Sequence, residues 1–180
     1  MNRWFIVFSV SAILFHADRL QAQSDGAAPA PVYPHVKGYL SFLIPVVTIN
    51  KDETITEFEK ATTIGFPVGI NIYYSERFAF SFEITPSVQW SQQKDSAIAS
   101  KTSNLLFAPG PMFRFKHNFN IIARMAFETQ GRYGFTAVFN KVYLHTRDVN
   151  YFISLSVPCR FGNAKPPSVG LGLQFGFTFN

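Results

Sequence analysis

Large apolar side chains occupy every second position of the stretch 169–180, from Val169 to Phe179. The positions between them hold three glycines and the polar residues Gln174, Thr178 and Asn180. Because successive side chains of a β-strand point to opposite faces, this pattern predicts a strand with one apolar face and one face of small or polar groups. The stretch has the length of about 9–11 residues with which a tilted strand crosses a bilayer. We expect the other strands to close a barrel with it.

The same alternation predicts seven further strands. They are Val36–Pro45, Thr62–Tyr74, Phe78–Ser91, Leu105–Lys116, Phe119–Gln130, Phe135–His145 and Asn150–Phe161. Segment 135–145 has apolar residues at both odd-numbered and even-numbered positions. Since a lysine should not face the middle of a bilayer, Lys141 predicts that the odd-numbered positions of this segment point inward. Pro109 and Pro111 predict a bulge in their strand.

Two kinds of barrel use such alternation: a soluble barrel turns the apolar face inward, and a membrane barrel turns it towards lipid. A face made largely of glycine offers nothing for solubility, but it suits the interior of a narrow barrel. The connections alternate in length, as in outer-membrane barrels. Turns 75–77, 116–118 and 146–148 are short, whereas 46–61, 92–104 and 162–168 are longer. Aromatic residues flank the short turns, and Trp90 and Tyr133 are expected at the opposite rim. The membrane barrel is therefore favoured.

The start of the chain has the three-part layout of a secretory signal peptide, residues 1–22. It comprises a short basic start, an apolar run over 4–15 and an Ala-Gln junction at the expected cut. The alternative is a buried N-terminal helix. Residues 23–35 are expected to form a Pro-rich leader on the periplasmic side, and residues 36–180 the barrel domain.

The Ala-Gln junction, the series of hairpins and the ending Gly172-Leu-Gln-Phe-Gly-Phe-Thr-Phe179 resemble a known group of proteins. The chain is similar, over nearly all of its length after the signal, to small outer-membrane barrels of the OmpA/OmpX type and to PorT-like outer-membrane β-barrel domain proteins. The fold expected is all-β, an eight-stranded antiparallel up-and-down transmembrane β-barrel in the outer membrane of a Gram-negative bacterium. These families usually end on the aromatic residue, whereas Asn180 follows it here, and they share no catalytic residues.

Charge and cysteine usage exclude several kinds of site. The net charge is +5, but the charges are scattered without a run of like sign, so nucleic-acid binding is not expected. Cys159 is the single cysteine, which excludes an intramolecular disulfide and a Cys-based zinc site. The four histidines lack metal-ligand spacing. We expect no metal, no cofactor and no catalytic residue.

Charged residues on the predicted inner faces form the first candidate site. They are Lys37, Glu83, Arg114, Arg124, Glu128 and Arg160. Charges inside a narrow barrel must pair, so the simplest interpretation is a salt-bridged core, with Glu83 among Arg114 and Arg124. The alternative is a gate or an anion-attracting cavity, since the cations outnumber the acids. An eight-stranded barrel is normally filled by side chains, so a wide pore is not expected.

An acidic hairpin tip is the second candidate site. The alternation continues past Pro45 and resumes over 54–63, which predicts that the first two strands extend beyond the membrane and close near 51–54. The candidate interaction residues are Lys51, Asp52, Glu53, Glu57, Phe58 and Glu59. An exposed strand edge can pair with another chain. The alternatives are a floppy polar loop here, and an interaction surface on the loop 92–104.

The predicted function is therefore that of a monomeric barrel embedded in outer-membrane lipid, with a structural role or an interaction with an adhesion or secretion partner through its extracellular loops. Two alternatives remain. A lipid-modifying enzyme would need a His with a Ser or acidic partner at one rim. His145 has Thr146 and Asp148 nearby but no Ser. A secreted soluble ligand-binding barrel is the other alternative.

Overall fold

The computed structural model describes residues 32–51, 54–56, 61–91 and 99–179, with only the backbone of 61–62, 89–91 and 99–103. The strands are β1 (His35–Asn50), β2 (Thr54–Thr56), β3 (Ala61–Gly65), β4 (Val68–Tyr73), β5 (Phe78–Ser91), β6 (Ala99–Arg114), β7 (Phe119–Glu128), β8 (Tyr133–His145), β9 (Val149–Phe161) and β10 (Ser168–Phe179). The predicted signal peptide and most of the leader lie outside the described residues. In the described part of the chain, no helix has the length and apolarity needed to span a membrane.

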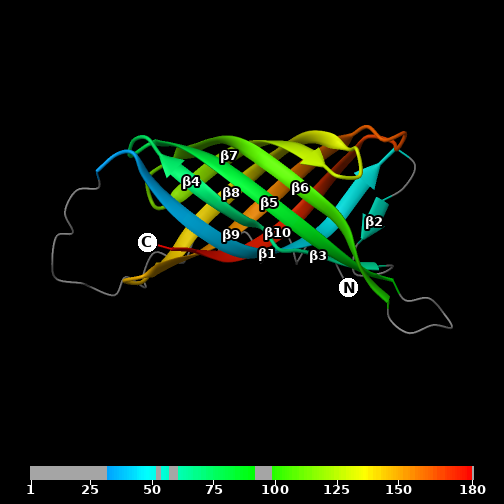
Figure 1. Ribbon diagram of the computed structural model, residues 1–180, viewed down its shortest axis with the longest axis horizontal. Coiled ribbons are helices and arrows are strands. Elements are labelled where there is room, and N and C mark those ends of the chain that lie inside the picture. The colour runs from blue at the N-terminus through cyan, green and yellow to red at the C-terminus, as the bar shows by residue number, and fades with distance from the viewer. Residues whose placement is uncertain (1–31, 52–53, 57–60, 92–98, 180) are drawn as a thin grey trace, which may run out of the picture.

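Antiparallel pairing closes the strands into a ring, β1-β4-β5-β6-β7-β8-β9-β10 (Figure 1). The first and last strands pair from Tyr39 opposite Thr178 to Asn50 opposite Ser168, which leaves no open edge between them. β3 continues β4 in the same register along β5, interrupted only at Phe66 and at Pro67, which has no N–H to donate. The all-β, eight-stranded, antiparallel up-and-down barrel predicted from the alternation is thus confirmed.

The first hairpin lies where the sequence predicts, since β1 continues past Pro45 to Asn50 and β2 begins at Thr54. β2 pairs with β1 from Val47 opposite Thr56 to Ile49 opposite Thr54. The other edge of β1 stays paired with β10 as far as Asn50. β1 therefore lies in the barrel wall along its whole length.

Side chains alternate between a packed interior and an apolar exterior. Inward positions are small or polar, and Ser41, Ala79 and Ser81 have no exposed surface. Outward positions are large and apolar: among them are Phe42, Val68, Ile70, Ile84, Phe107, Phe113, Met125, Phe127, Phe135, Phe139, Val169 and Phe175, each more than a third exposed. An outer surface of this kind is suited to lipid, because a soluble protein rarely exposes so large an apolar patch.

The bulge predicted at Pro109 and Pro111 lies elsewhere. β6 passes through both prolines in one register with β5, and the register shifts only at Ser103, after the pair Ser87 opposite Asn104. The prolines act on the other edge of β6, where pairing with β7 is interrupted between Phe107 and Met112. A proline cannot donate to the ladder, so this interruption follows from the two missing N–H groups.

The predicted facing of strand 135–145 is wrong. In β8, the even-numbered Gly134, Thr136 and Val138 are buried, and the odd-numbered positions from Tyr133 to Lys141 point outward. The facing changes only after the register shift between Val142 and Leu144, beyond which His145 points inward. Lys141 points outward too, but it lies near the short-turn end, opposite Phe119, and its Nζ donates to the carbonyl oxygen of His117 at 2.8 Å. The lysine argument failed because it assumed that this residue lies in the middle of the bilayer.

Aromatic pairs surround the short turns, as expected for an interfacial girdle. Tyr74 and Phe78 have ring centroids 6.1 Å apart, as do Phe115 and Phe119. At the opposite rim Tyr133 is exposed and packs at 6.3 Å against Phe161. The side chain of Trp90 lies outside the described residues. These belts place the barrel axis across a membrane.

Candidate functional site

A buried ion pair lies at mid-height inside the barrel. Arg124 of β7 donates from Nη1 to Oε2 of Glu83 on β5 at 2.8 Å, and the two side chains are 4% and 6% exposed. The strand between them, β6, places Gly110 in register with Ser81. A Cβ at Gly110 would collide with the backbone of Ala123 and Arg124, so the glycine lets β7 approach closely and lets the arginine reach across.

Tyr39 of β1 completes this network from the opposite wall. Its hydroxyl donates to Glu83 Oε2 at 2.8 Å and accepts from Arg124 Nη2 at 2.9 Å. Thr85 donates to the other carboxylate oxygen at 3.1 Å, and Arg124 Nη2 also donates to Ser81 at 3.1 Å. A buried pair of charges is tolerated when hydrogen bonds satisfy most of its remaining atoms in this way. We name Tyr39, Ser81, Glu83, Thr85 and Arg124 the central network.

Gly69 makes room for Tyr39, since a Cβ at this position would meet the phenol ring and the carbonyl oxygen of Phe82. Gly69→Ala is therefore expected to displace the phenol and to lower the free energy of unfolding by about 1–3 kcal/mol, the usual cost of overpacking. Urea unfolding of the protein in detergent measures this. Gly38→Ala is the matched control on β1, because its Cβ would come no nearer than 3.7 Å to any atom. Equal stability of the two variants would contradict this role of Gly69.

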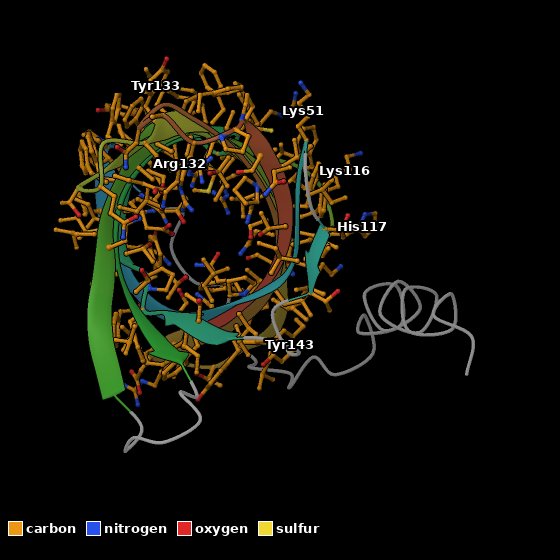
Figure 2. All side chains as sticks on the ribbon, turned by 90° about the vertical axis from the view of Figure 1, so that its right-hand side faces the viewer. Lys51, Lys116, His117, Arg132, Tyr133 and Tyr143 are labelled. Carbon is orange, nitrogen blue, oxygen red and sulfur yellow. The ribbon has the colours of Figure 1, made fainter. Side chains whose placement is uncertain are left out.

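A second ion pair closes the barrel interior towards the longer loops. Arg160 donates from Nε to Glu128 at 2.6 Å, and its Nη1 donates to the Thr136 hydroxyl at 3.0 Å. Asn104 donates to the other oxygen of Glu128 at 2.8 Å. Arg132 lies above this pair and donates to the carbonyl oxygen of Arg160 at 3.3 Å. Figure 2 views the ring from this end, with Arg132 directed inward.

The remaining two cations lie at the other end. Lys37 and Arg114 line a cavity at the short-turn mouth, and the Arg114 guanidinium lies over the ring of Tyr73, with Cζ 5.1 Å from the centroid. The structure thus divides the six predicted residues among three levels. Glu83 lies with Arg124, as the sequence suggested, but Arg114 is not part of that pair.

Sequence reasoning missed Tyr39 and Arg132. Tyr39 falls between the apolar positions Gly38 and Leu40, so the alternation could have predicted that its side chain points inward. The alternation could not have predicted its hydrogen bond to Glu83. Arg132 lies in a turn, where no periodicity assigns a direction. Its Nη2 donates to Ser168 at 3.0 Å, joining the β7–β8 turn to the start of β10.

A small cavity of about 40 Å³ lies below the central network. Asn71 Oδ1 and Arg124 Nε are buried there and have no hydrogen-bond partner among the described residues. A polar cavity of this size has room for ordered water, but for no larger solute. Within the described residues, no three His, Cys, Asp or Glu side chains gather in a way that could hold a metal.

The hairpin tip is described only in part. Lys51 is exposed at its start, whereas Asp52, Glu53, Glu57, Phe58 and Glu59 lie outside the described residues. The described β2 residues, Thr54–Thr56, pair with β1 as given above. The structure therefore fixes where the hairpin lies on the rim, next to the start of β10.

Comparison with known proteins now adds to the geometry. No protein-family model and no curated protein matches the sequence. Among solved structures, the fold resembles Ail, the attachment invasion locus protein of Yersinia pestis, with a TM-score of 0.53 at 6% identity, covering 82% of this chain and all of Ail. The chain has the fold of a small transmembrane β-barrel.

Two other similar structures have lower scores. The de novo designed barrel TMB2.3 matches with a TM-score of 0.40 at 15% identity, covering 80% of this chain and 94% of that one. The monoaromatic hydrocarbon channel CymD matches with a TM-score of 0.34 at 11% identity, covering 79% of this chain and 44% of its own. The resemblance to Ail concerns the fold alone.

Proposed function

We propose that this protein is an integral outer-membrane barrel of a Gram-negative bacterium, of the OmpA/OmpX or PorT-like type, with a structural or interaction role made through its extracellular loops. The observation that carries this proposal is the central network. Tyr39, Glu83 and Arg124 meet across the interior at mid-height, so hydrogen-bonded side chains fill this level of the barrel. A barrel filled in this way is suited to presenting its rim rather than to conducting.

The longer-loop rim offers strand edges for such an interaction. β6 pairs with β5 as far as Ala99 opposite Ser91, but its pairs with β7 begin only at Leu106. Over 99–104, β6 therefore has no neighbouring strand on that side among the described residues. β2 has β1 on one side and, within the same part of the chain, no strand on its other side. Edges of this kind are templates for pairing with another chain.

Trimming the hairpin tip tests which edge matters. Deletion of 51–60 is expected to abolish capture of a protein partner by the barrel in mild detergent, and to leave membrane insertion and heat stability close to those of the wild type. The physical reason is that β1 keeps its ladder with β10 after the tip is removed. Affinity capture followed by mass spectrometry, with heat-modified gel mobility as the folding check, measures both.

Deletion of 92–98 is the matched control, because it shortens the other long connection at the same rim. If the barrel lacking 51–60 retains its partners and the barrel lacking 92–98 loses them, the interaction surface belongs to the β5–β6 hairpin. If both deletions retain every partner, the proposed interaction role is wrong.

A further inference from the structure

The short-turn mouth contains a cavity of about 390 Å³, at the end of the barrel opposite the proposed interaction surface. The short-turn end of the barrel, where β10 ends, is at the left in Figure 1. Its polar lining comes from β1, β4, β6, β7, β8, β9 and β10 and includes Lys37, Arg114, His35, His145 and Asn118. Polar atoms make up the larger part of the lining, so the cavity is suited to a hydrated or charged ligand.

The charged residues that line this cavity, among those the structure describes, have one sign. Lys37 and Arg114 line it together, and none of the described lining residues is an aspartate or a glutamate. Two like charges that share a partly buried space repel each other, and they repel most where water is restricted. An anion bound between them would remove this repulsion and form charge-assisted hydrogen bonds.

Arg114 is held in place for such a contact. Its guanidinium lies over the Tyr73 ring, and the ring of His35 stacks on the same tyrosine at 4.8 Å and 14°. Stacking uses the face of the guanidinium and leaves the N–H groups at its edge to donate. Among the described residues, Arg114 has no carboxylate partner.

The two histidines each have one ring nitrogen occupied. His35 Nδ1 donates to the carbonyl oxygen of Val32 at 3.3 Å, and His145 Nδ1 lies 2.7 Å from Oδ1 of Asn150. These bonds fix the orientation of both rings and involve only Nδ1. Nε2 of each ring is the nitrogen that a ligand in the cavity would meet.

The inner end of the cavity adjoins the small cavity beneath the central network, with which it shares Tyr73, Asn120, Val142 and Thr178. The small cavity, of about 40 Å³, has room only for water. A larger ligand that enters from the short-turn side therefore binds in the wider cavity at the mouth.

We propose that the short-turn mouth binds a phosphate group. The fork of Arg114 and the ammonium of Lys37 supply the charge, and the amide of Asn118 supplies a further donor. A carboxylate would be satisfied by one guanidinium, whereas the several oxygens of a phosphate can use donors from β1, β6 and the turn after β6 together. The site is independent of the interaction surface proposed above.

Titration with inorganic phosphate tests this site, with the full-length barrel in zwitterionic detergent at constant ionic strength. Calorimetry is expected to give saturable binding to the wild type, weakened about tenfold or more by Arg114→Gln or by Lys37→Gln, since each removes a charged donor. Lys116→Gln is the matched control, because this exposed lysine lies in the adjacent turn and does not line the cavity. Heat-modified gel mobility checks that each variant is folded.

Competition distinguishes the two sources of a phosphate. Short-chain phosphatidylglycerol that displaces inorganic phosphate would support the site with a lipid headgroup as its ligand. If the lipid does not compete, the ligand is a soluble phosphate. The proposal is overturned if phosphate does not bind saturably, or if both cavity variants bind it as tightly as the Lys116→Gln control.

Discussion

Glu83→Gln is expected to lower the free energy of unfolding of the barrel by about 3–5 kcal/mol, because the substitution leaves Arg124 buried without a counter-charge. The amide keeps the volume of the carboxylate and can still bond to Thr85 and Tyr39, so the loss reports on the charge rather than on packing. Arg124 cannot lose its proton to relieve the cost. Urea unfolding in lipid vesicles, followed by tryptophan fluorescence, measures the change in midpoint at constant slope.

A double-mutant cycle provides the control for this expectation. Arg124→Met removes the other charge, and the pair of substitutions together should cost much less than the sum of the two single ones. Additive effects would mean that Glu83 and Arg124 do not depend on each other. A stable Glu83→Gln barrel would contradict the central network directly.

Phe82→Arg is expected to destabilise the inserted barrel by about 2–4 kcal/mol, because it places a charge on the lipid-facing surface near the middle of the bilayer. Phe82 lies on β5 between the inward Ser81 and Glu83, and it pairs with Ile70 and Pro109 on the neighbouring strands. Folding efficiency and unfolding free energy in lipid vesicles measure the effect.

Phe115→Arg is the matched control at the aromatic belt beside the short turn, where the same charge should cost about 0–1 kcal/mol. This residue is 55% exposed next to the turn, so its arginine can reach the interface. If both variants cost the same, the depth of the two residues in the bilayer has been misjudged. If Phe82→Arg folds as well as the wild type, its face does not contact lipid.

The period of the alternation was enough to predict the ring of strands and most of the inward faces. β5 has the predicted bounds, Phe78–Ser91, because its large apolar residues occupy only even-numbered positions along the whole strand. β8 carries apolar residues at both parities, so its facing depended on Lys141. The depth of Lys141 in the membrane could not be read from the sequence, and the facing was therefore predicted wrongly.

The candidate site shows the same limit. The alternation of inward and outward positions placed all six charged residues on inner faces. It could not give their height along the barrel axis, which depends on strand tilt and register. Arg114 and Arg124 lie on adjacent strands, yet Arg114 pairs with Asn120, four residues from Arg124. One contacts Tyr73 and the other contacts Glu83. Only the register separates them.

The pairing of β1 with β10 has a consequence for how this chain folds. The closing ladder joins the two ends of the barrel sequence, and within it Gln174 donates to the hydroxyl of Ser41, 133 positions away. Contacts between such distant residues form late, because loop-closure entropy must be overcome before they contribute. Until the last strand is in place, β1 and β9 each present an unpaired edge, which is a template for aggregation or for exchange with a second copy. The barrel therefore cannot close before β10 has been synthesised, and until then its two open edges remain available to other chains.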